Sequence, residues 1–430
     1  MEVQPLARAF ALRQQKNYPQ ALGIYQPLWQ QDPNQLDDWA GWSYAYCLKE
    51  TRQYQQALDV CRQLYQRFPQ TPIIGQLYAG CIYYTQFTGR EMPEVAVAKK
   101  AVQAMFGLCP PHQKYSLTSK AIFKLAKLLM SQAAVNWPEI ESWLLKLDPD
   151  LLDDKPFSMK APNGKTIEYA SPVEEWYSAM IKVKAGLNQP NELLALLEAA
   201  RKRQLKWHYS NPVWFARKEA FAYLQLGQGE KAEKILREII TRKKDWFLLQ
   251  DLADMVTDPK EALCLLATAA LAFGDADKKI KLYYSIFNKI NQDPALKEEA
   301  KQHLLLVAAI RHQHNWPIPA TMQSELVAYD APELNGLQYN GIIRQLTPFW
   351  SKLANAGKTY LVGAIEKLLE GNQSGFVKTA DGKRYYFSMR EVKPPVNKAI
   401  AGAGVRFELE DGFDKKRNQA TKNAVRLIIQ

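Results

Sequence analysis

An internal repeat of 36 residues restricts the possible fold more than any other feature of the sequence. The segments "YPQALGIYQPLWQQDP" and "YQQALDVCRQLYQRFP" align without a gap, so that Ala21 matches Ala57 and Pro33 matches Pro69. A third segment, "AVAKKAVQAMFGLCP", again places an alanine, Ala98, twelve residues before a proline. A small residue lets two helices approach closely, apolar residues at helical spacing fill the interface, and a proline ends the second helix. The repeat therefore predicts helical hairpins that stack on one another.

This pattern resembles the tetratricopeptide repeat (TPR) family, in which alanine, an aromatic residue and proline recur at this spacing. The second helices match well. The first helices match less closely, because "DDWAGWSYAYCLKETRQ" carries Trp39, Gly41, Trp42 and Tyr44 at shifted positions. The resemblance implies a mainly α protein with a right-handed, TPR-like solenoid of helical hairpins. A protein partner on the repeat surface is the function that this family implies.

The helical spacing of apolar residues continues with less regularity and predicts one helical-repeat domain over residues 1–316. Residues 148–172 interrupt it with prolines and an Asn-Gly turn, which predicts a loop or hairpin insertion. Pro317 and Pro319 cannot both lie inside a helix, so a connecting segment, partly helical, is expected over residues 317–357.

The last part of the chain, residues 358–430, changes to short strands separated by turns. The strands are expected in "TYLVGAIEKLL", "SGFVKTA", "RYYFSMREV", "VRFELEDG" and "QATKNAVRLII", with an Asp-Gly turn after the second. Five strands in a segment of this length predict a small all-β barrel of the oligonucleotide-binding (OB) kind.

The barrel segment resembles the cold-shock domain family through "GAIEKLLEGNQSGFVK", "DGKRYYFSMREV", "GVRFELEDG" and "KKRNQATKNAV". The resemblance implies that Phe376 and Tyr386 stack on unpaired bases, and two-residue alternation places Arg384, Tyr386 and Ser388 on the outer face, with Tyr385 and Phe387 inside. The nucleic-acid-binding residues expected from this reading are Phe376, Lys378, Lys383, Arg384, Tyr386, Ser388, Lys415, Lys416 and Arg417.

Three positions depart from the cold-shock pattern. Ser374 replaces an aromatic residue, Ser388 replaces a histidine, and Lys367 stands where a tryptophan often stacks. Two remaining rings supply only about 2 to 6 kcal/mol before ordering costs, and a millimolar complex already requires about 4 kcal/mol. Binding of single strands by the barrel alone is therefore expected to be weak.

The charge distribution agrees with a polyanionic partner. The net charge is +12, and residues 351–430 hold fifteen Lys and Arg against eight Asp and Glu. Residues 198–245 hold twelve basic and six acidic residues, whereas the first hundred residues are close to neutral. A concentrated basic excess is typical of nucleic-acid-binding surfaces, although solvated helix faces also account for such charge.

The sequence offers no support for an enzyme. The "NAGKTY" segment carries Lys352 where a phosphate-binding loop requires a glycine, and His312 and His314 point in different directions on a helix. The five cysteines are scattered, which favours buried reduced thiols over a zinc site or disulfides. No cofactor, metal or membrane contact is expected. The opening "MEVQPLARAFALRQQ" lacks the apolar core of a signal peptide, so the cytoplasm is the expected location.

The function expected from these observations is that of a noncatalytic adaptor. Its barrel would bind single-stranded RNA or DNA, with RNA preferred, and its repeats would bind a protein. The alternative is a pure protein scaffold whose barrel has lost its ligand. A weaker resemblance links such a chain to repeat proteins with cold-shock-like tails in bacterial conflict and defence systems.

Overall fold

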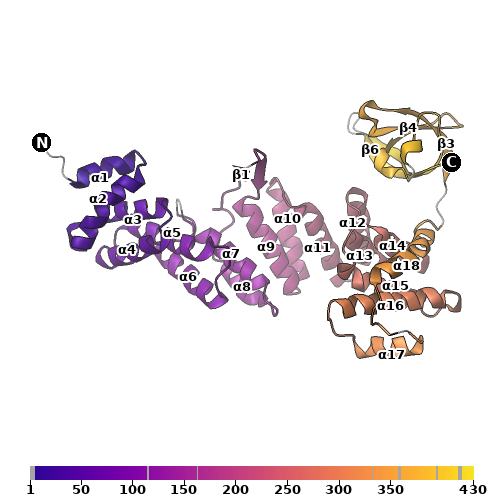
Figure 1. Ribbon diagram of the computed structural model, residues 1–430, viewed down its shortest axis with the longest axis horizontal. Coiled ribbons are helices and arrows are strands. Elements are labelled where there is room, and N and C mark those ends of the chain that lie inside the picture. Colours follow the sequence, from indigo (N-terminus) through magenta and orange to yellow (C-terminus); the bar gives the residue numbers. More distant parts are fainter. Residues whose placement is uncertain are drawn as a thin grey trace. The chain divides into compact units, whose positions relative to one another are not determined.

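The computed structural model describes residues 5–113, 116–161, 163–331, 333–356, 360–393, 396–414 and 419–430. The chain divides into two compact units, residues 1–227 and residues 228–430 (Figure 1). This division falls inside the helical domain that the sequence predicts over residues 1–316.

The first unit consists of consecutive helical hairpins. Its helices are α1 (Pro5–Gln14), α2 (Tyr18–Gln31), α3 (Asp38–Glu50), α4 (Tyr54–Arg67), α5 (Pro72–Phe87), α6 (Val95–Leu108), α7 (Thr118–Met130), α8 (Trp137–Leu144), α9 (Pro172–Gly186), α10 (Pro190–Lys202) and α11 (Asn211–Gln225). Each helix packs against the next one along the chain. The predicted TPR-like stack of hairpins is confirmed.

The repeated alanines lie where two helices meet. Ala21 in α2, Ala57 in α4 and Ala98 in α6 are all fully buried. The partner helices approach closely as well, since a Cβ atom added to Gly41 would lie 2.3 Å from a methyl carbon of Leu64. The 36-residue repeat therefore places a small residue at each of these helix–helix contacts, where it sets the distance between the helices.

The interruption at residues 148–172 contains a two-stranded antiparallel hairpin. Its strands are β1 (Phe157–Lys160) and β2 (Thr166–Tyr169). The backbone N–H of Ala161 donates to the carbonyl of Lys165, and Gly164 adopts a φ of 77°, which a glycine reaches at little cost. In Figure 1 the hairpin projects from the helices near α9 and α10.

The second unit begins with seven α-helices in its described part. They are α12 (Gly229–Arg242), α13 (Trp246–Ala253), α14 (Pro259–Leu271), α15 (Ile280–Ile290), α16 (Lys297–Gln313), α17 (Ala320–Ala328) and α18 (Tyr339–Ala354). The segment that the sequence describes as a connection, residues 317–357, supplies α17 and α18. Both helices pack on α16, and the fully buried ring of Trp350 in α18 joins the core of this unit.

The strands of the second unit form a closed barrel, as the sequence predicts. They are β3 (Leu361–Leu368), β4 (Ser374–Thr379), β5 (Arg384–Ser388), β6 (Gly404–Asp414) and β7 (Gln419–Ile429), in the order β3-β4-β5-β7-β6. All neighbours are antiparallel except β5 and β7, which are parallel. The barrel interior is filled by Ile365, Val377, Phe387, Val405 and Phe407.

Among the described helices, none combines the length and the apolar character that crossing a bilayer requires. All five cysteines are free thiols, four of them buried and Cys264 partly buried.

Candidate nucleic-acid interface

The outer face of β4 and β5 carries Phe376 and Tyr386, the two aromatic residues that the sequence predicts to stack on bases. Val377 and Phe387 point into the barrel and are fully buried, so the alternating residues Phe376 and Tyr386 lie outside. Tyr386 is 40% exposed, whereas Phe376 is half-buried. The predicted orientation of both rings is therefore what the structure shows.

A glycine keeps this strand in place beneath the rings. Gly375 lies between Ser374 and Phe376 and faces the interior, where an added Cβ atom would lie 2.7 Å from the Phe387 ring and 2.5 Å from the carbonyl oxygen of Lys367. A side chain at this position would push β4 away from β3 and from the core.

The rings belong to one row of directly opposed residues across the sheet. Lys367 of β3 is opposite Phe376, Phe376 is opposite Tyr386, and Tyr386 is opposite Asn423 of β7. The two ring centroids lie 5.9 Å apart at an interplanar angle of 72°, which is an edge-to-face contact. The ammonium nitrogen of Lys367 lies 5.9 Å from the centroid of Phe376. Tyr386 is thus the more accessible stacking surface of the two.

The predicted cations around the rings differ in their partners. Lys378 is exposed, and the described residues show no ion pair to its side chain. Arg384 pairs with Glu366 of β3 at 2.5 Å, and Lys383 pairs with Asp381 at 3.0 Å. The Lys383–Asp381 pair is exposed and worth roughly 0 to 1 kcal/mol, so a phosphate group can replace the carboxylate at small cost. The Glu366 side chain is mostly buried, so its charge is more costly to leave without Arg384.

The turn between β4 and β5 is held by its own aspartate. Hydrogen bonds from the Thr379 hydroxyl and, next in importance, from Lys383 hold the pKa of Asp381 at about 2. Asp381 is therefore ionised throughout the physiological range. The backbone N–H of Gly382 donates to the Thr379 carbonyl, which closes the turn that the Asp-Gly pair predicts.

The remaining predicted residues have other positions. Ser388 ends β5, opposite Ser374, and its hydroxyl accepts a hydrogen bond from the backbone N–H of Arg390 at 3.4 Å. Its contact is thus with a local turn. Lys415, Lys416 and Arg417 fall between β6 and β7, outside the described residues.

Sequence reasoning missed Asn423, which lies beside Tyr386 in the row. The parallel pairing of β5 with β7 places Asn423 there. No local sequence pattern predicts a parallel contact between segments so far apart. Within the described residues, no group of three or more His, Cys, Asp and Glu side chains is arranged to hold a metal ion. The chemistry available at this face is stacking, hydrogen bonding and charge.

One family model matches part of the chain. Residues 213–328 match a family described as "Domain of unknown function (DUF7017)", which covers parts of both units. No curated protein matches the chain in sequence.

Solved structures with helical repeats are similar to the chain at low identity. A tetratricopeptide repeat protein from Parabacteroides merdae is 12% identical over 70% of this chain and 98% of its own, with a TM-score of 0.30. The human IFIT1 dimer with PPP-AAAA is 11% identical over 81% of this chain and 78% of its own, with a TM-score of 0.37. A thermophilic TPR protein from Thermus thermophilus is 12% identical over 70% and 97%, with a TM-score of 0.21. Similarity at these levels says nothing about a shared ligand.

Proposed function

We propose that this chain is a noncatalytic adaptor whose barrel binds single-stranded nucleic acid, RNA in preference to DNA, and whose helical repeats bind a protein. The observation that carries the proposal is the exposed Tyr386 ring beside Phe376, with Lys378 on β4 and Lys367 on the neighbouring strand β3. Any base can lie flat on an aromatic ring, while lysines follow the phosphates.

The position of the rings in the barrel supports this assignment. Five-stranded OB barrels use the outer face of their second and third strands to bind oligonucleotides, and β4 and β5 are the second and third strands here. The cold-shock-like character of the barrel, the cytoplasmic location and a role in a bacterial defence system are parts of the same proposal. The support for these three parts comes from the sequence patterns alone.

The ring geometry implies weak binding by the barrel alone. One accessible ring contributes about 1 to 3 kcal/mol per stacked base, less than the roughly 4 kcal/mol of a millimolar complex. The phosphate contacts of Lys367 and Lys378 must supply the rest. Most of the affinity is therefore electrostatic, and it falls steeply as salt is added.

The test is a salt titration of binding to short oligo-U RNA, oligo-dT and duplex DNA. We expect Tyr386→Ala to raise the Kd for RNA about 5- to 150-fold, because it removes the exposed stacking surface. Tyr386→Phe keeps the ring and serves as the matched control. We expect Phe376→Ala to have a smaller effect than Tyr386→Ala, since Lys367 and Tyr386 already cover part of its ring.

Lys378→Gln should act differently from the ring variants. We expect it to lower affinity for RNA and single-stranded DNA alike and to reduce the salt slope by about 0.7, the value for one phosphate contact on a single strand. A wild-type protein without salt-sensitive binding to any of the three nucleic acids would contradict the proposal and favour the protein scaffold.

A further inference from the structure

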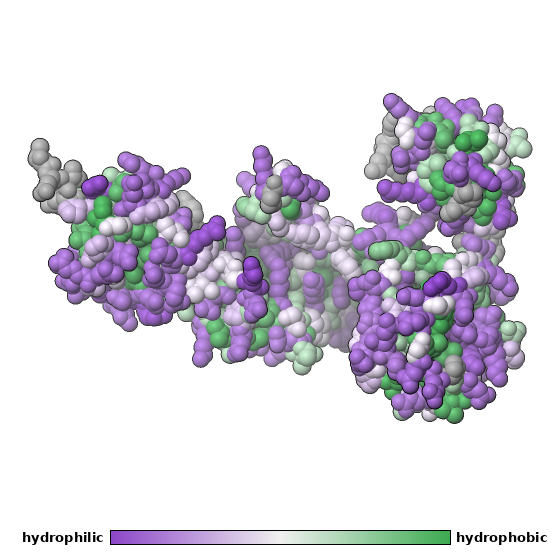
Figure 2. Space-filling view, in the orientation of Figure 1, coloured by the Kyte–Doolittle hydropathy of each residue, from purple (hydrophilic) through white to green (hydrophobic). Residues whose placement is uncertain are grey.

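The β1–β2 hairpin of the first unit has one apolar face. Phe157 lies opposite Tyr169 and Met159 lies opposite Ile167, so these four side chains share one side of the two strands. The rings of Phe157 and Tyr169 contact each other at 6.3 Å. The exposed fractions are 63% for Phe157, 49% for Met159, 39% for Ile167 and 36% for Tyr169. Figure 2 shows apolar atoms among polar ones at this projection.

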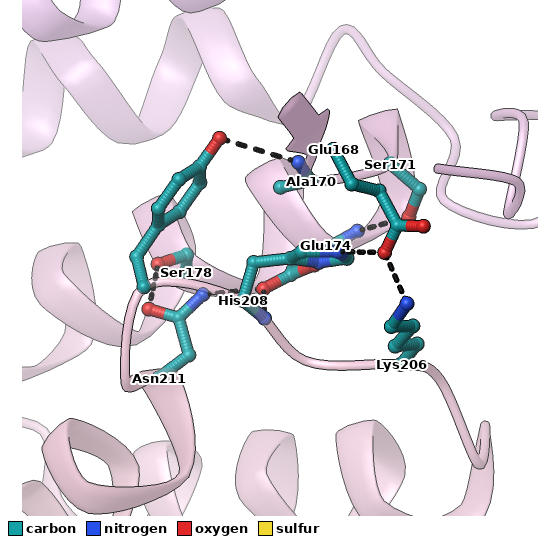
Figure 3. A network of polar contacts seen from close by, with 9 residues as sticks. Glu168, Ala170, Ser171, Glu174, Ser178, Lys206, His208 and Asn211 are labelled. Carbon is teal, nitrogen blue, oxygen red and sulfur yellow. Dashed lines mark hydrogen bonds and ion pairs between the residues drawn. The ribbon is translucent and has the colours of Figure 1, made fainter. Parts of the chain in front are cut away.

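The polar face of the hairpin is the one attached to the helices. Glu168, on the opposite side of β2 from Ile167 and Tyr169, accepts a hydrogen bond from Nε2 of His208 at 2.7 Å and pairs with Lys206 (Figure 3). The backbone N–H of Ala170 also donates to the Tyr209 hydroxyl at 3.4 Å. An amphipathic hairpin normally turns its apolar side inward, and here the polar contacts reverse that orientation.

A buried carboxylate holds His208 in position. Glu174 of α9 is fully buried, and its Oε2 accepts from Nδ1 of His208 at 2.6 Å. Its Oε1 accepts from the His208 backbone N–H at 2.5 Å and from Nδ2 of Asn211 at 2.7 Å. The hydrogen bonds to Glu174 and then to Glu168 raise the pKa of His208, since two carboxylates favour an imidazolium that donates from both nitrogens. The network fixes which side of the hairpin faces solvent.

The outer edge of β1 is open. In the described residues β1 pairs only with β2, so alternate backbone N–H and C=O groups along its other edge have no strand partner. Lys160 and Lys165 are exposed at the turn end of the hairpin, and the described part of the chain offers no ion pair to their ammonium groups. Lys155, at the base of the hairpin, adjoins the exposed Asp153 and Asp154. An apolar face, an unpaired strand edge and unpaired positive charge thus lie together on one projection.

We propose that β1 accepts an extended segment of a partner protein as a third strand, and that this segment alternates apolar with acidic residues. Its backbone pairs with the open edge, its apolar side chains cover Phe157 and Met159, and its carboxylates meet the lysines. The proposal deepens the protein-binding half of the proposed function and rests on that half alone. The open strand edge and the aliphatic side chains of Met159 and Ile167 favour a peptide over stacked bases, although the face also carries the Phe157 and Tyr169 rings.

The probe is a displayed library of random twelve-residue peptides, selected on the full-length protein, followed by synthesis of the enriched sequences. We expect enriched peptides that alternate apolar residues with Asp or Glu.

We expect the double substitution Phe157→Ser and Met159→Ser to raise the Kd of these peptides at least tenfold. Leu145→Ser, which alters a residue of the same unit that is 63% exposed and lies outside the hairpin, should change the Kd less than twofold. Lys160→Glu should weaken acidic peptides and leave neutral ones unchanged.

Amide NMR of the wild-type protein tests the contact without any substitution, so misfolding of a variant cannot explain the result. Saturating peptide should shift the amide signals of Ser158 and Lys160, which belong to β1. The proposal is overturned if no enriched peptide depends on Phe157 and Met159, if the double variant affects only RNA binding, or if it only abolishes self-association of the chain. Tyr386→Ala should leave peptide binding unchanged, so failure of this inference and failure of nucleic-acid binding are separate results.

Discussion

His303 is held as a neutral imidazole in the helical core of the second unit. Its Nδ1 donates to the carbonyl of Glu299 at 2.7 Å, and its Nε2 accepts from the indole N–H of Trp350 at 2.8 Å. A ring that donates on one side and accepts on the other is neutral, and a second proton on Nε2 would break the hydrogen bond from Trp350. Burial lowers the pKa of His303 to about 4. No local sequence pattern predicts this hydrogen bond, because Trp350 lies on a different helix.

This histidine predicts a loss of stability in acid. The unfolded chain takes up a proton near pH 6.5 and the folded chain only near pH 4, so the free energy of unfolding falls as the pH falls between these values. The contribution of His303 to this loss is about 3 kcal/mol. Urea unfolding of the wild type and of His303→Gln between pH 7 and pH 4 measures it. The substitution should remove this part of the pH dependence, and equal pH slopes for both proteins would contradict the assignment.

At the barrel face, the sequence predicts which residues point outward but not how their rings meet. Two-residue alternation is enough to place Phe376 and Tyr386 outside, because neighbouring side chains of a strand always alternate. The 72° angle between the rings depends on their own packing, with Lys367 beside Phe376. The Glu174–His208 contact joins residues 34 positions apart without a local motif, so no sequence pattern predicts it.

Among the elements, the second helix of each repeat is the predictable one. Ala57 and its equivalents mark α2, α4 and α6, because a position where two helices touch tolerates only a small side chain. In the first helices of the repeats, the close contacts fall on positions that the 36-residue period does not relate, such as Gly41 in α3 and Gly75 in α5. In α5, a Cβ atom added to Gly75 would lie 2.9 Å from the carbonyl oxygen of Leu108, while one added to Gly80 would meet nothing within 4 Å.

These two glycines of one helix give a matched pair of substitutions. Gly75→Ala should destabilise the first unit by about 1 to 3 kcal/mol, because the clash is with backbone and α5 must move away from the end of α6. Gly80→Ala should stabilise it by about 0.5 to 1 kcal/mol through helix propensity alone. Thermal unfolding followed by circular dichroism compares them. A stabilising effect of both substitutions would show that α5 and α6 do not pack this closely.

At the scale of the whole chain, the sequence predicts the order of parts better than their boundaries. Helix α16 ends at Gln313, shortly before Pro317 and Pro319, where the sequence predicts a connecting segment. The two prolines do not mark the end of the helical core, since Met322, Ile342 and Trp350 return to it from α17 and α18. A break in helical spacing shows where a helix stops, whereas the packing partner of the next helix is a long-range property.

Trp350→Ala tests whether α18 belongs to that core. Removal of a fully buried indole should destabilise the second unit by about 3 to 5 kcal/mol and leave His303 without its hydrogen-bond donor. Trp316→Ala removes an exposed tryptophan of the neighbouring segment and should change stability by less than about 0.5 kcal/mol. Chemical denaturation of the two variants measures the difference. If Trp350→Ala were as mild as Trp316→Ala, α18 would be a mere connection between helices and barrel.

The closure of the barrel involves the residue that we propose stacks on bases. Strands β6 and β7 pair along most of their length, whereas β5 meets β7 through Tyr386 and Asn423, with a further isolated bridge between Val392 and Leu427. A junction with so few backbone pairs opens at a lower free energy than the rest of the barrel. Because the stacking residue is itself a member of this junction, a base lying on Tyr386 would also hold the barrel shut. Under the proposed function, occupancy of the Tyr386 face by a base and opening of the β5–β7 junction would be a single equilibrium.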